Sequence, residues 1–137
     1  MNADLKTIKL ICFESILTAY FPPPPKGYAS EAEARMEGGA LDRLGNPLHT
    51  LQDFLAWKVP YVSVAMDVNA FVYGTPLCIP SFNHAFGVDI VFRVVDMGNY
   101  FRNKGRTEMD ICVMDKRASE DPIVNQSHIV VAALKEE

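Results

Sequence analysis

The sequence predicts a mainly β protein that folds as one small barrel. Short β-branched segments follow one another from residue 60 onward, and Gly, Pro and Asn turns separate them. The chain has 137 residues, 49% of them hydrophobic and 22% charged, which suits a single self-sufficient core. We therefore expect residues 1–137 to form one domain.

Six segments of the chain are the expected strands. Residues 5–19 are rich in Ile, Leu, Phe and Thr and predict one or two strands, although their apolar pattern also fits a helix. The later segments combine β-branched residues with alternation, as in YVSVAM and VDIVFRVV. They cover residues 61–66, 71–79, 88–95, 110–114 and 128–134.

An insertion at about residues 30–58 is expected to hold one or two short helices. Ser30 and Glu33 form a capping-box pattern at the start of residues 30–36. Before them, the prolines at 22–25 favour a stiff polyproline II connector, or alternatively one wall of a binding groove.

The second helix is expected at residues 50–58 (TLQDFLAWK), with Thr50 as its N-cap. Its apolar side chains would form a buried side, and a carbohydrate-stacking role is the alternative for the tryptophan. These side chains are Leu51, Phe54, Leu55 and Trp57. Residues 80–87 (PSFNHAFG) are expected to form an exposed loop, in which His84 is a turn residue or a substrate contact.

Charge and hydropathy exclude several classes of partner. The net charge is −4 and no Lys/Arg cluster is present, so neither nucleic acid nor an anionic membrane surface is an expected partner. No stretch approaches 18 apolar residues, and no basic start precedes the first apolar segment. We expect synthesis in the cytoplasm without a visible signal peptide, so action on a cell wall or periplasm would need a non-classical route or a leader outside this sequence.

Cysteines and histidines provide no expected cofactor or metal site. Cys12, Cys78 and Cys112 lie far apart without a CxxC pair, and each sits in an apolar run. We expect buried free thiols, with one disulfide pair as the alternative. The three histidines are scattered along the chain, so no metal ligand set is expected.

Three aspartates fall at the ends of expected strands: Asp67, Asp96 and Asp110. Each could simply cap a turn. As a group, clustered carboxylates would raise the pKa of at least one member, and glycosidic cleavage needs such a protonated acid. The other aspartates considered are expected to be solvated turn or cap residues. They are Asp42, Asp53, Asp115 and Asp121.

Five segments resemble, in order, the motifs of a known family. They are residues 17–22 (LTAYFP), 64–67 (VAMD), 73–80 (YGTPLCIP), 96–98 (DMG) and 104–111 (KGRTEMDI). Together they resemble the three-aspartate (3D) domain of cell-wall muralytic proteins and the related catalytic barrel of membrane-bound lytic transglycosylase A.

The resemblance implies a six-stranded double-psi β-barrel, the fold of barwin-like endoglucanases and expansins. It implies Asp110 as general acid and then base, with Asp96 and Asp67 as its companions. Tyr20 and Thr75 match residues that line the same cleft. The motif residues Gly98, Lys104 and Arg106 are also expected at the substrate.

The chain departs from the family pattern between its second and third aspartates. Residues 99–103 (NYFRN) form a bulkier segment than the Gly-rich loop of the family, which makes Tyr100 and Arg102 candidates for sugar contacts. Val72 and Tyr73 replace the Pro and Leu of the family motif.

The family chemistry predicts cleavage of the bond between N-acetylmuramic acid and N-acetylglucosamine. One carboxyl group protonates the leaving oxygen and then removes the proton of the muramic acid 6-hydroxyl, which closes a 1,6-anhydro ring.

Two rival functions use the same barrel: an endoglucanase-like polysaccharide hydrolase and an expansin-like glycan-binding module without turnover. A muralytic protein without a leader could be a phage lysin or an antibacterial effector carried by a secretion system, and an immunity protein would then be a further partner.

Overall fold

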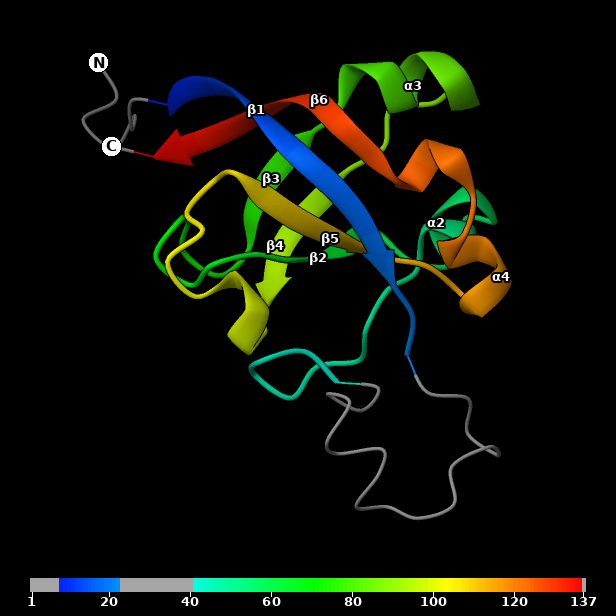
Figure 1. Ribbon diagram of the computed structural model, residues 1–137. Helices are drawn as coiled ribbons and strands as arrows, with labels where there is room; N and C mark the ends of the chain where they lie inside the picture. The colour runs from blue at the N-terminus through cyan, green and yellow to red at the C-terminus, as the bar shows by residue number, and fades with distance from the viewer. Residues whose placement is uncertain (1–7, 23–40, 137) are drawn as a thin grey trace, which may run out of the picture.

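Six strands form a closed barrel of mixed parallel and antiparallel pairs. The computed structural model describes residues 8–22 and 41–136. The strands are β1 (Ile8–Tyr20), β2 (Val62–Ala65), β3 (Thr75–Cys78), β4 (Phe92–Asp96), β5 (Glu108–Cys112) and β6 (Gln126–Glu136). They close in the order β1-β5-β2-β4-β3-β6 (Figure 1). The predicted mainly β barrel with short helices is confirmed.

The pairing places strands from distant parts of the chain side by side. β1 runs antiparallel to β6 along most of its length and parallel to β5 from Ile16 to Tyr20. β2 lies between β5 and β4, antiparallel to the first and parallel to the second. Residues 5–19 were open to a helical interpretation, and residues 8–20 form one long strand.

Alternate side chains of the strands fill the barrel. The central members are fully buried, because in a strand every second residue points to the same face. They include Val64 of β2, Phe92 and Val94 of β4, Ile111 of β5 and Val131 of β6. The residues between them, such as Asp110 of β5, therefore point to the outer face of the barrel. Asp96 of β4 comes two residues after the inward-facing Val94, and a register shift in the β2–β4 pair brings it opposite Ala65 instead.

Short helices connect the strands. These are α2 (Leu51–Leu55), α3 (Pro80–Phe86) and α4 (Lys116–Ser119), with the 3-10 turns η1 (Asn99–Phe101) and η2 (Pro122–Val124). Asp115 and Asp121 cap α4 and η2 through their side chains, so their expected cap roles are confirmed. Among the described residues, no helix is long and apolar enough to cross a membrane.

The exposed loop expected at residues 80–87 is wrong, because this segment is helix α3. Pro80 stands in the first turn, where its missing N–H is not needed, and Gly87 ends the helix in the left-handed region at φ 71°. Phe82 is fully buried and packs edge-on against Phe92 of β4. Helix α3 therefore contributes to the core rather than to an exposed substrate loop.

Helix α2 begins where it was expected, after Thr50, but it ends earlier than expected. The Thr50 side chain accepts a hydrogen bond from the Asp53 amide at 3.0 Å. The helix ends at Leu55, so Trp57 lies beyond it and is 83% exposed, which contradicts its expected place on the buried side. The expected helix at residues 30–36 and the prolines at 23–25 lie outside the described residues.

The cysteines are all free, and they differ in burial. Cys112 is buried as expected, and Cys78 is half-buried. Cys12 is exposed, so the expectation of a buried thiol is wrong there. The reason is its position in β1, where it points to the outer face between the inward-facing Ile11 and Phe13.

Candidate functional site

A row of four side chains crosses four adjacent strands. Thr18 of β1 pairs with Asp110 of β5, Asp110 pairs with Ala65 of β2, and Ala65 pairs with Asp96 of β4. Residues in register point to the same face, and the register shift between Val64 and Ala65 in the β2–β4 pair is what brings Asp96 into this row. We call these four residues the acid row.

Ala65 in the acid row separates the two acids. Two strand spacings put the backbones of Asp96 and Asp110 roughly 10 Å apart. The Ala65 side chain between them is a single methyl group and is 5% exposed, so neighbouring side chains cover it.

Tyr20 joins the row to its second acid. It stands two residues after Thr18 in β1, on the same face, and pairs with Cys112 of β5. The Tyr20 hydroxyl donates a hydrogen bond to Asp96 Oδ2 at 3.1 Å. Burial, with the nearby Cys112 and Asp96, raises the pKa of Tyr20 well above its usual value, so the phenol keeps its proton as a donor.

Asp110 is the acid with the fewest stabilising partners. It is half-buried, and burial raises its pKa, while a hydrogen bond from the Thr18 hydroxyl to Oδ1 lowers it. The Thr18 hydroxyl stabilises the carboxylate form but supplies no full positive charge. Asp110 therefore holds its proton to higher pH than an exposed aspartate does.

Asp96 has a different environment. Burial also raises its pKa, but hydrogen bonds from the Met97 amide at 2.9 Å and from Tyr20 oppose this shift. The positive charge of Arg43 lowers the pKa of Asp96 further, and the negative charge of Asp42 raises it. Asp96 therefore has more support for its ionised form than Asp110 has.

Asp42 and Arg43 come from the segment that precedes α2. The Arg43 amide donates to the Val95 carbonyl at 3.2 Å, which ties this segment to the end of β4. The Arg43 guanidinium lies 5.5 Å from the centre of the Tyr73 ring, and among the described residues its Nη1 atom is buried without a hydrogen-bond partner. The insertion thus supplies a cation near Asp96.

Asp42 is a turn residue as expected, but the expectation that it is solvated is wrong. Its carboxylate is 6% exposed and accepts hydrogen bonds from the amides of Leu44 and Asn46 and from the Tyr73 hydroxyl. These bonds offset the cost of burying the charge, which the sequence pattern of a turn does not reveal.

Asp67 serves a different part of the structure. Its Oδ1 accepts from the Asn69 amide and its Oδ2 from the Gly105 amide, both at 3.0 Å. These two bonds, with a further one from the Asn103 amide, lower its pKa. Asp67 is thus an ionised anchor for the loop between β4 and β5. The structure brings Asp96 and Asp110 together around Tyr20, and it engages Asp67 with backbone amides.

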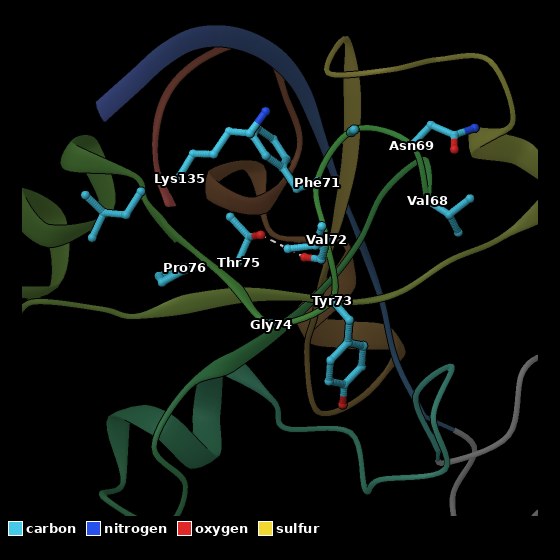
Figure 2. A pocket seen from close by; sticks show the side chains of 11 residues that line it. Val68, Asn69, Phe71, Val72, Tyr73, Gly74, Thr75, Pro76 and Lys135 are labelled. Atoms are coloured by element: carbon cyan, nitrogen blue, oxygen red, sulfur yellow. Dashed lines mark hydrogen bonds between the residues drawn. The ribbon is translucent and has the colours of Figure 1, made fainter. Parts of the chain in front are cut away.

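Two pockets lie near the expected substrate residues. The larger, of about 610 Å³, is lined by residues 68–76 with Leu134 and Lys135 (Figure 2). Thr75 turns toward Val72 in this pocket, and its hydroxyl donates to the Val72 carbonyl at 2.7 Å (Figure 2). The smaller pocket, of about 200 Å³, is lined by Asp67, Gly98 and Arg102 among others. Neither pocket is lined by Asp96 or Asp110, so chemistry rather than volume identifies the acid row as the candidate site.

The remaining expected substrate residues contact one another or the large pocket. Tyr100 is 63% exposed, and its hydroxyl donates to Glu108 Oε1 at 3.1 Å. Lys104 Nζ lies 5.0 Å from the Tyr100 ring centre and 3.5 Å from Glu108 Oε2. The Arg106 guanidinium lies 5.1 Å from the ring centre of Phe71, a residue that lines the large pocket.

Three residues around the acids were not singled out from the sequence: Thr18, Arg43 and Cys112. Thr18 had a detectable signal, because it precedes Tyr20 by two residues in an expected strand. Cys112 follows Asp110 by the same spacing, and burial raises its pKa, so it remains a neutral thiol. Arg43 had no comparable signal, because it reaches Asp96 from a separate segment.

In the described part of the chain, no group of three or more His, Cys, Asp or Glu side chains is placed so that it could bind a metal ion.

The chain matches no protein-family model, no curated protein and no solved structure.

Proposed function

We propose that the protein cleaves the glycan strands of peptidoglycan, with Asp110 as the general acid. The observation that carries this proposal is a half-buried carboxyl group of raised pKa that has a hydroxyl donor and faces a second acid across Ala65. A protonated carboxyl group is the donor that a glycosidic oxygen needs in order to leave.

The proposed reaction uses one residue twice. Asp110 donates its proton to the oxygen between N-acetylmuramic acid and N-acetylglucosamine, and the C–O bond breaks. The Asp110 carboxylate then takes the proton of the muramic acid 6-hydroxyl while that oxygen bonds to C1. The products are a 1,6-anhydro end and a free 4-hydroxyl, and Asp110 is protonated again.

The second acid has a supporting role in this reaction. Positive charge develops on the sugar ring in the transition state, and an ionised Asp96 would stabilise it. Tyr20, the Met97 amide and Arg43 all favour that ionised form. Burial raises the pKa of both acids, and Asp96 differs from Asp110 in having more groups that favour its ionised form.

The ligand class follows from charge and from the resemblance. The site is acidic and the chain carries a net charge of −4, which disfavours strongly anionic polymers such as nucleic acid. The segments at 17–22 and 104–111 that resemble the muralytic family supply Thr18, Tyr20 and Asp110. These observations favour a cell-wall glycan over other polysaccharides.

Digestion of purified sacculi tests the proposal directly. We expect soluble muropeptides with 1,6-anhydro ends, detected by mass spectrometry. Products with reducing ends would show that the protein hydrolyses the bond instead. Release from cellulose or chitin but not sacculi would favour an endoglucanase-like enzyme, and binding to sacculi without any release would overturn the catalytic proposal.

Replacing Thr18 with valine is expected to move the alkaline limb of the pH–rate profile upward. The Thr18 hydroxyl lowers the pKa of Asp110, so its removal raises that pKa and keeps the acid protonated to higher pH. Initial rates of sacculus solubilisation between pH 4 and 9 would show the shift. Thr18→Ser, which keeps the hydroxyl, is the matched control, and an unchanged limb in Thr18→Val would remove Thr18 from this role.

Replacing Arg43 with methionine is expected to move the acid limb upward instead. The Arg43 charge lowers the pKa of Asp96, so its loss leaves Asp96 protonated over a wider acidic range. The same pH–rate measurement applies, with Arg43→Lys as the control that keeps the charge. Equal loss of rate at every pH would indicate a structural role only.

A further inference from the structure

Helix α2 ends in a tight motif whose left-handed residue is a tryptophan. The Lys58 amide donates to the Asp53 carbonyl at 2.9 Å, and the Trp57 amide donates to the Phe54 carbonyl at 3.0 Å. This pair of bonds defines a Schellman motif, and Trp57 occupies its C′ position at φ 63°. Glycine is the usual residue there, because a Cβ atom is strained in this region.

Tryptophan is an unfavourable choice for this position on two independent grounds. The left-handed backbone disfavours a bulky residue, whereas Asn103, the other non-glycine residue of positive φ in the described ranges, is of a type that tolerates it. The side chain is also 83% exposed, so little burial offsets the strain. Strain retained at an exposed aromatic residue indicates a use for the ring.

We propose that Trp57 is a stacking platform for one sugar ring of a glycan strand, at a subsite next to the acid row. An indole offers a flat apolar face to the C–H face of a pyranose ring, and its N–H can bond a sugar hydroxyl. The identity of the glycan bound at this subsite rests on the proposed function. The subsite itself would add a binding residue outside the acid row.

The position of α2 links this platform to the acids. Gln52 Oε1 of α2 accepts a hydrogen bond from the Met114 amide at 2.8 Å. The negative charge of Asp53, the next residue, contributes to the raised pKa of Cys112, which pairs with Tyr20 across β1 and β5. Trp57 follows Asp53 by four residues, so the two backbones lie within about 14 Å of each other. The platform therefore lies just beyond the end of the helix that contacts the segment directly after β5, the strand that carries Asp110.

A sugar ring fits this surface better than a protein partner does. The exposed neighbours of Trp57 along the chain, Ala56 and Lys58, are small and charged, so the ring is isolated within its segment. Energetically dominant aromatic residues of protein interfaces are instead surrounded by contacts that exclude water. A single solvated ring is suited to one unit of a repeating polymer.

Intrinsic fluorescence tests the platform, because Trp57 is the only tryptophan of the chain. The Asp110→Asn protein, which is expected to bind without cleaving, is titrated with soluble peptidoglycan glycan fragments of increasing length. We expect a saturable blue shift of the emission with longer fragments. Emission that does not respond while the same fragments bind by calorimetry would overturn the proposal.

Trp57→Gly separates binding from folding. It removes the ring and relieves the left-handed strain, so we expect an unchanged or slightly raised Tm and about tenfold weaker retention on sacculi. Trp57→Phe keeps an aromatic face and should retain most of the binding. Unchanged retention of Trp57→Gly would overturn the platform, and Trp57→Asn, also tolerated in this conformation, repeats the test on a second background.

The outcomes separate this inference from the proposed function. A wild-type protein that binds glycan through Trp57 but releases no product supports the platform and overturns the catalytic role. Release of product at an unchanged KM for sacculi in Trp57→Gly supports catalysis and overturns the platform.

Discussion

Replacing Asp110 with asparagine is expected to slow glycan cleavage at least ~100-fold and to raise the Tm at pH 7. Asparagine keeps the size of the side chain and cannot donate the proton to the glycosidic oxygen. The gain in stability follows from the raised pKa of Asp110. Burial disfavours the carboxylate form of Asp110, whose population grows as the pH rises, whereas asparagine carries no charge at any pH.

The raised pKa of Asp110 determines how the Tm difference between Asp110→Asn and the wild type changes with pH. Because the pKa of Asp110 is raised in the folded state, its contribution to stability is complete below the unfolded value of about 4. That contribution is lost as the pH rises through the folded pKa. The Tm advantage of Asp110→Asn should therefore be largest at neutral pH and should shrink toward pH 3.

Thermal unfolding between pH 3 and 8, beside sacculus digestion, checks both parts. Asp89→Asn is the matched control, since Asp89 is exposed and lies outside the acid row. Near-normal cleavage by Asp110→Asn would remove Asp110 from the role of acid. A lower Tm at pH 7 would contradict the environment described for its carboxyl group.

Replacing Asp67 with asparagine is expected to have the opposite effect on stability, lowering the Tm at pH 7 by several degrees. Both Asp67 oxygens accept hydrogen bonds from backbone amides, among them those of Asn69 and Gly105. An asparagine places an NH₂ group against one of these donors, so at least one bond is lost and two donors face each other.

The pKa of Asp67 is lowered by these bonds, so the linkage has the reverse sign. Its contribution to stability is present above the unfolded pKa and is lost as the pH falls through the folded pKa. The Tm deficit of Asp67→Asn should therefore shrink at acid pH. A deficit that persists unchanged at low pH, or the absence of any deficit at pH 7, would contradict the anchoring role.

Together the two variants distinguish a catalytic acid from a structural one. Asp110→Asn should lose activity and gain stability, which is typical of a strained functional group. Asp67→Asn should lose stability first and lose activity only through the loop between β4 and β5. Three aspartates that look alike in the sequence thus have different environments, which depend on what their oxygens contact.

Local features of the sequence were enough to predict much of the fold. Alternating β-branched segments predicted the strands, and Thr50, Asp115 and Asp121 were recognisable as caps, because both signals act over a few residues. Local signals failed where burial came from distant segments. Residues 80–86 were expected to be a loop, but they form helix α3, because Phe82 packs in the core. Trp57 was expected on the buried side of α2, but the helix ends two residues before it.

The sequence by itself determined that this chain is a barrel of short strands with acidic residues at the strand ends, because strand periodicity and turn residues are local properties. Only the tertiary structure decided which acids meet. The strand order β1-β5-β2-β4 places Thr18, Asp110, Ala65 and Asp96 in one row. No local pattern encodes that order, since it depends on closing the barrel around a shared core, and the same closure brings Arg43 to Asp96 and leaves Asp67 with the loop amides.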